Sequence, residues 1–281
     1  MALIAIALIA ISAAAKDISY AAGYLLIPSS PCSDALQGTD LASLNPAHYA
    51  FYDGWGFGIT QAFHIAGENQ NNLSLRWGNQ KLFAGLSAYI ASENEIEGRT
   101  HPTEEPEYLF GAHQAVFTAS LGWSPKKAFA IAAAAKRISE KIELNEMNAT
   151  AFDIGAIVQP SDNITVQIAA SNVGDKVRYK DVLYSLPLMY SAGLWLKYPI
   201  LSGGISVQKP DITPIRATIA AERNLTDWLF IRAGLIYGQD SRLFSAGASF
   251  RYDGWEFSYS FVPYRNGLGI RHSIGLEYHS L

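Results

Sequence analysis

A strict alternation between aromatic and polar side chains, present in residues 255–261, is the feature that most restricts how this chain can fold. Successive side chains of a β-strand point to opposite faces, so this segment predicts a strand with one apolar and one polar face. The apolar face consists of Trp255, Phe257, Tyr259 and Phe261, and the polar face of Glu256, Ser258 and Ser260. Similar alternation recurs along most of the chain. The resulting sheet must cover its apolar face either with a second protein layer or with lipid.

The composition favours lipid over a second protein layer. Only 16% of the 281 residues are charged, whereas soluble domains average roughly 25%. The mean hydropathy of +0.07 suits a transmembrane β-barrel, in which only half of each strand faces lipid. The formal net charge of -4 argues against a nucleic-acid partner, so we predict none.

Alternating segments of roughly ten residues, the length that a tilted transmembrane strand needs, can be counted along the chain. They predict an all-β fold, a transmembrane antiparallel β-barrel of about 14 strands, occupying residues 50–281. The expected strands are residues 54–66, 71–78, 81–91, 109–123, 127–139, 148–159, 163–171, 187–198, 200–208, 215–224, 227–237, 243–252, 254–262 and 266–279.

The connections between these segments give a second signal. Alternate connections are tight, as at 79–80, 124–126, 160–162 and 253–254, whereas 92–108, 141–147 and 172–186 are longer. Tight turns on one rim and longer loops on the other are typical of outer-membrane barrels. Aromatic residues near strand ends, including Trp55, Trp77, Tyr89 and Trp123, predict girdles at the membrane interfaces. A soluble sandwich would instead contain shorter strands.

The amino-terminal region lacks this alternation. Residues 1–15 are almost wholly apolar and end in three alanines, which predicts a secretory signal peptide, although no basic residue precedes the apolar stretch. An amino-terminal membrane anchor is the alternative, but this stretch is shorter than a bilayer-spanning helix. Residues 16–49 are expected to form a hatch inside the barrel or a periplasmic segment, with Asn45, Pro46 and Ala47 as its candidate ligand or hatch residues.

No enzymatic or metal-binding motif is present, so we predict a protein that is not an enzyme and binds no metal or cofactor. His272 is an exception to the alternation, because it falls on an apolar face. Charges of both signs fall on the polar, inward faces of the strands. Their balance favours a network of ion pairs over a selective lining for a pore. These residues are Arg76, Asp153, Arg216, Glu222, Arg232, Arg251, Glu256, Arg271 and Glu277.

Several short stretches resemble, in order, the PorV/PorQ family of outer-membrane barrels, which belongs to the FadL-like superfamily. They are residues 24–28, 35–38, 45–47, 135–142, 152–156, 170–174, 186–188 and 271–278. The resemblance implies a fourteen-stranded barrel with an amino-terminal hatch, located in the bacterial outer membrane. It also implies a role as a protein-binding accessory of an envelope or type IX-like secretion assembly, with secretion proteins as partners beside outer-membrane lipid.

Two other functions stay open. The first is a FadL-like channel for small hydrophobic molecules, which predicts a lateral gap and an apolar pocket beside the hatch, whereas a lumen filled by side chains would oppose it. Pro199 and the pair Gly203 and Gly204 are candidate sites of the strand distortion that such a gap requires. The second is a purely structural barrel within a larger envelope assembly.

Overall fold

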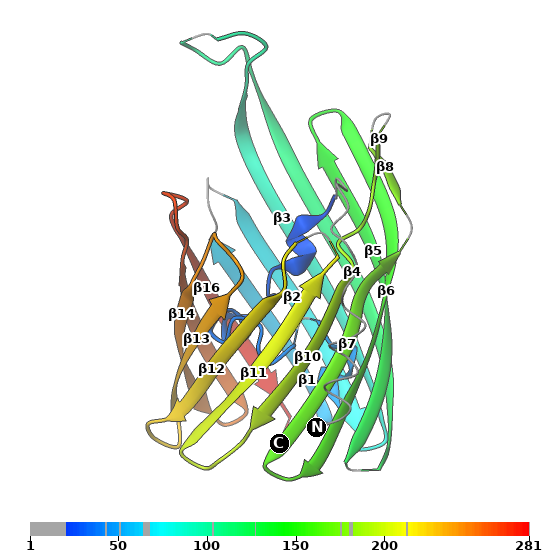
Figure 1. Ribbon diagram of the computed structural model, residues 1–281, viewed down its shortest axis with the longest axis vertical. Helices are drawn as coiled ribbons and strands as arrows, with labels where there is room; N and C mark the ends of the chain where they lie inside the picture. Colours follow the sequence, from blue (N-terminus) through cyan, green and yellow to red (C-terminus); the bar gives the residue numbers. More distant parts are fainter. Residues whose placement is uncertain are drawn as a thin grey trace.

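The computed structural model describes residues 21–42, 44–50, 52–63, 68–102, 104–126, 128–174, 176–179, 182–211 and 213–280. Within these ranges, fourteen antiparallel strands form a closed barrel, which confirms the predicted fold (Figure 1). Each strand pairs with its neighbours in sequence, and β1 pairs with β16 to close the sheet. The predicted signal peptide, residues 1–15, lies outside the described residues and stays a prediction.

The barrel strands agree closely with the alternating segments. They are β1 (Asp53–Phe63), β2 (Asn69–Asn79), β3 (Leu82–Gly98), β4 (Tyr108–Lys126), β5 (Phe129–Ile142), β6 (Asn145–Ser161), β7 (Ile164–Gly174), β10 (Met189–Leu196), β11 (Leu201–Pro210), β12 (Arg216–Asn224), β13 (Leu229–Tyr237), β14 (Phe244–Tyr252), β15 (Trp255–Pro263) and β16 (Ile270–His279). A separate hairpin, β8 (Val177–Tyr179) and β9 (Val182–Tyr184), lies in the connection from β7 to β10.

The barrel exposes apolar side chains on its outside and buries polar ones inside. In β15, for example, Trp255 and Phe257 are exposed, whereas Ser258 and Ser260 are almost fully buried. This polarity is the reverse of that in a soluble protein and suits a wall surrounded by lipid. His272 lies on the outer face, where its ring is 2.7 Å from the hydroxyl of Tyr259, so that each polar group has a partner.

The barrel wall is taller on one side. Strands β3 to β6 contain 14 to 19 residues, whereas β10 to β16 contain 8 to 10. The β3–β4 hairpin extends farthest from the rim of tight turns (Figure 1). The expected long loop 141–147 is wrong, because β5 ends at Ile142 and β6 begins at Asn145. The expected loop 92–108 is also shorter, since Glu93, Glu95 and Glu97 belong to β3.

Large aromatic side chains gather on the outer face near the rim of tight turns. Trp55 pairs with Trp77 across β1 and β2, and Trp255 pairs with both Tyr252 and Tyr278. Trp55, Trp77, Tyr252 and Trp255 are exposed and Tyr278 is half-buried, as expected for a girdle at a membrane interface. The assignment of Tyr89 to a girdle is wrong, because its ring points inward and stacks on Tyr24 with a centroid distance of 5.7 Å.

The described residues between 21 and 50, ahead of β1, lie inside the barrel and contact its strands (Figure 1). They contain η1 (Gly23–Leu26), α2 (Pro31–Ala35) and η2 (Pro46–Tyr49). Ser30 caps α2 by accepting a hydrogen bond from the Ser33 amide, and the following proline fits the first helical position. None of the helices in the described ranges has the length and apolar character needed to cross a bilayer.

Candidate functional site

The hatch, defined here as the described residues between 21 and 50, fills the lumen and contacts the wall at several levels. Asn45 caps the start of η2, where its side-chain oxygen accepts a hydrogen bond from the Ala47 amide at 2.9 Å. Its amide nitrogen donates to the Ala156 carbonyl on β6 at 3.3 Å. Gly155 allows this approach, because a Cβ there would collide with the Asn45 side chain. The predicted hatch residues Asn45, Pro46 and Ala47 are all buried against the wall.

A fully buried ion pair joins helix α2 to strand β16. The Arg271 Nε atom lies 3.0 Å from Oδ2 of Asp34, and these side chains are only 2% and 0% exposed. Ser273 donates to the same carboxylate oxygen at 2.6 Å, while Arg271 also contacts Gln70 and the Pro28 carbonyl. Arg271 therefore lies inside the barrel but holds the hatch. Asp34 was missed by the sequence analysis, because the hatch has no alternation to mark its inward residues.

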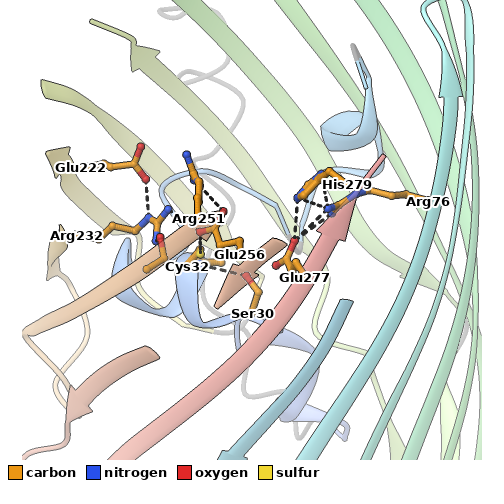
Figure 2. A network of polar contacts seen from close by, with 11 residues as sticks. Ser30, Cys32, Arg76, Glu222, Arg232, Arg251, Glu256, Glu277 and His279 are labelled. Atoms are coloured by element: carbon orange, nitrogen blue, oxygen red, sulfur yellow. Dashed lines mark hydrogen bonds and ion pairs between the residues drawn. The ribbon is translucent and has the colours of Figure 1, made fainter. Parts of the chain in front are cut away.

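A second polar group lines the lumen beside α2 (Figure 2). Arg232 lies between two carboxylates, with nitrogen–oxygen distances of 2.6 Å to Glu222 and 3.1 Å to Glu256. Glu256 also pairs with Arg251 at 2.5 Å and accepts a hydrogen bond from the Cys32 thiol at 3.3 Å. Burial, reinforced by the Glu256 carboxylate, raises the pKa of this thiol well above its usual range. Cys32 is consequently a neutral thiol in the hatch.

A third group joins Arg76 of β2 to Glu277 and His279 of β16, across the intervening strand β1 (Figure 2). The Arg76 guanidinium is 3.2 Å from Glu277 and also contacts the His279 ring. Arg76 further lies over the ring of Tyr52, 4.8 Å from its centroid. Nearby in the hatch, burial lowers the pKa of His48, although the Asp40 carboxylate opposes this shift.

A fourth polar group lies at an irregularity in the wall. The register between β6 and β7 shifts after Phe152, so that Ser171 and Asn172 together oppose Asp153. Asn172 has a φ of 62° and is 1% exposed. Its amide donates to Asp153 at 2.7 Å, and its side-chain oxygen accepts from Lys136 at 2.8 Å. Lys136 in turn lies 2.6 Å from Asp153, which completes a buried triad.

The remaining predicted inward charge, Arg216, is buried on the inner face of β12. The expected distortion at Pro199, Gly203 and Gly204 is absent, because both glycines continue the regular register with β10 and β12. Gly204 instead leaves room for the neighbouring Trp195 ring. The irregularity of this region of the wall lies two barrel strands earlier, in β7.

Small cavities lie between the described residues of the hatch and the wall. One, of about 210 Å³, lies beside the groups around Arg232 and Arg76, and another, of about 80 Å³, lies beside Asn45 and Lys136. The larger has room for several water molecules or a small polar solute. The described residues contain no group of three or more His, Cys, Asp or Glu side chains that could hold a metal ion.

An apolar cluster lies inside the barrel near the irregular wall. It joins the start of the hatch to β4, β5, β6, β8 and the segment before β10. Burial in this cluster raises the pKa of the Tyr24 hydroxyl above its usual range. Its buried members are Ala22, Tyr24, Val116, Ile138, Met147, Ala149, Ala151, Val177 and Leu186.

Comparison with known proteins gives no match to a family model and none to a curated protein. Solved structures do match. The toluene transporter TodX of Pseudomonas putida aligns with a TM-score of 0.62 at 11% identity, over 89% of this chain and 98% of that chain. A FadL homologue of Pseudomonas aeruginosa aligns with a TM-score of 0.55 at 14% identity, over 94% and 99% of the respective chains. The chain therefore has the fold of FadL-like outer-membrane barrels.

Proposed function

We propose that this protein is a channel of the bacterial outer membrane that passes small hydrophobic molecules and is closed by its hatch. The carrying observation is that the backbone pairing between β7 and β10 ends early, directly beside an apolar cluster in the lumen. Support for the class of solute comes from the fold, which is similar to that of the toluene transporter TodX. The secretion role implied by the PorV/PorQ resemblance is the weaker candidate, because the similar structures named above include a transporter and no secretion protein.

The pairing between β7 and β10 ends before β7 does. The paired residues nearest the tall rim are Ser171 and Met189, whereas Val173 and Gly174 pair only with β6. Above this level, the gap beside β7 is covered by the segment before β10, whose Pro187 carbonyl accepts a hydrogen bond from Asn172 at 3.1 Å. Side-chain contacts and a loop therefore replace the backbone ladder at this point of the wall.

Apolar side chains line the inner side of this gap. Leu186 and Val177, from the covering segment and β8, pack with Tyr24 of the hatch and Met147 of β6. Displacement of the covering segment would connect the outer lipid with an apolar part of the lumen. A hydrophobic solute could then enter without crossing the polar groups around Arg232.

Passage also requires the hatch to move. In the described conformation the hatch fills the lumen, which opposes an open channel, and leaves small cavities of about 210 Å³ and about 80 Å³ against the wall. The cavities are also lined largely by polar side chains, which do not favour an apolar solute. We therefore propose that this conformation is the closed state.

A reversible lock tests the proposal. Oγ1 of Thr39 in the hatch lies 2.8 Å from Oγ1 of Thr218 on β12, so cysteines at these positions are close enough to form a disulfide. In a Cys32→Ser background, we expect the oxidised Thr39→Cys/Thr218→Cys variant to lose uptake of labelled toluene into Gram-negative cells. Reduction should restore uptake. Each single-cysteine variant is the control, and undiminished uptake by the locked protein would refute the proposal.

A further inference from the structure

The outer face of β4, β5 and β6 changes from apolar to polar at a definite level. Nearer the tight turns, Ala119, Ala135 and Phe152 are cross-strand neighbours that face outward. The next outward row toward the tall rim contains Phe117, Arg137 and Thr150. Two further rows follow, Ala115 with Ser139 and Asn148, then His113 with Lys141 and Glu146.

The basic side chains in these outward rows have weaker ion-pair partners than those in the lumen. Inward Arg76, Lys136, Arg232, Arg251 and Arg271 each lie within 4.0 Å of a carboxylate. The outward Arg137 has no such partner among the described residues, and it makes only two long hydrogen bonds of 3.4 Å, to Thr150 and Asn148. Its guanidinium donors are thus largely available to a ligand.

Lys141 is also only weakly occupied. Its ammonium lies 3.6 Å from Glu146, and the two side chains are 52% and 63% exposed. Exposed pairs of this kind contribute little and exchange readily with other partners. His113 lies directly opposite Lys141 on β4 and is exposed as well.

The position of the outward polar rows, which contain Arg137, Lys141 and His113, indicates which ligand they bind. The rows begin where the lipid-facing apolar surface ends, which is the level of lipid headgroups. Long basic side chains at such a boundary place their stems against apolar surface and their charges in the headgroup layer. A guanidinium can bind phosphate with two parallel hydrogen bonds, and neighbouring hydroxyl and amide groups add further donors. A soluble anion would gain nothing from the adjoining apolar rows.

We propose that Arg137, Lys141 and His113, with Ser139, Asn148 and Thr150, bind the phosphorylated headgroup of a lipid in the leaflet at the tall rim. Phosphate oxygens accept hydrogen bonds from Arg137 and Lys141, while the acyl chains lie along the apolar rows below. The site depends on the barrel's location in a membrane and is independent of the proposed transport.

Native mass spectrometry of the full chain, titrated with bisphosphorylated lipid A, tests the site. Removal of two basic residues that face a headgroup layer should weaken binding about thirtyfold, so we expect that loss for Arg137→Gln/Lys141→Gln. The matched control is Lys176→Gln/Arg178→Gln, which removes the same charge from exposed positions near the tall rim. This control should bind like the unmodified protein.

Two further arms identify the ligand chemistry. Dephosphorylated lipid A should bind the unmodified protein about as weakly as bisphosphorylated lipid A binds Arg137→Gln/Lys141→Gln. Inorganic phosphate, at a concentration equal to that of the lipid, should not displace bound lipid. Equal binding by the two double variants, or displacement by inorganic phosphate, would overturn the proposal. A heat-shift gel confirms that each variant forms the barrel.

Discussion

At the scale of single residues, the buried pair of Asp34 and Arg271 has the clearest expected effect. Removing one partner of a buried ion pair typically costs about 3–5 kcal/mol, because the other charge stays without compensation. Asp34 belongs to the hatch and takes no part in the strand ladder. We therefore expect Asp34→Ala to loosen the hatch but not the barrel, which should appear as frequent open events in single-channel recordings.

The control for this change is Asp227→Ala, which removes an exposed carboxylate from the turn between β12 and β13. It should leave the recordings as quiet as those of the unmodified protein. The barrel's urea midpoint should change little in either variant. Quiet recordings from Asp34→Ala would contradict the role of this pair in holding the hatch.

The sequence predicted which charged residues face the lumen better than it predicted which residues they contact. A period of two identifies the polar face of a strand, so Arg232 and Glu256 could be assigned to the lumen directly. Which charges meet depends on strand register and on the hatch, and neither follows from alternation. Phe230 and Ile236, which blur the alternation of β13, are buried on the inner face. Phe230 lies under the Arg251 guanidinium, 4.0 Å from its carbon.

At the scale of elements, lipid explains which strand boundaries were predictable. Within the bilayer, strand length and alternation are both constrained, and most predicted ends lie within a few residues of the observed ones. Above the bilayer both constraints disappear. The predicted third strand ended at residue 91, whereas β3 continues to Gly98 with polar residues on both faces. The bulge in β7 gave no recognisable signal, because Asn172 also fits a turn.

This bulge gives a prediction that separates backbone conformation from hydrogen bonding. Asn172→Ala removes buried side-chain hydrogen bonds and also places a Cβ-bearing residue without a polar side chain at a φ of 62°. We expect it to lower the free energy of unfolding by about 2–3 kcal/mol. Asn172→Gly should cost about 1 kcal/mol less, because glycine readily adopts a positive φ. Urea unfolding in lipid vesicles measures both.

The control for the two substitutions of Asn172 is Asn163→Ala, in the exposed turn between β6 and β7. It should change the free energy of unfolding by less than about 0.5 kcal/mol. Equal stability of the alanine and glycine variants at position 172 would show that the left-handed backbone contributes nothing. Full stability of both would contradict the structural role of the triad with Lys136 and Asp153.

At the scale of the whole molecule, the distribution of polarity decides between a lipid-facing barrel and a two-layered soluble fold. Large apolar side chains are exposed around the outside, while arginine, glutamate and serine side chains are buried inside. Within the described residues, no second layer of strands or helices covers the outer face. The polar inner face of the wall holds the hatch through ion pairs and hydrogen bonds, such as that between Arg271 and Asp34, while apolar clusters join other parts of the hatch to the wall.

Two matched leucines test whether this outer face lies in lipid. Leu86 is 58% exposed at the centre of the outward apolar run of β3, and Leu109 is 57% exposed on the part of β4 that extends above the membrane. Arginine at the bilayer midplane costs about 2–4 kcal/mol on a barrel's lipid face and about 0–1 kcal/mol near the interfaces. We therefore expect Leu86→Arg, but not Leu109→Arg, to lower the urea midpoint markedly in lipid vesicles. If both substitutions lowered the urea midpoint equally, lipid would not surround the barrel at the level of Leu86. The effect of each arginine would then depend only on exposure, which is nearly the same at the two positions.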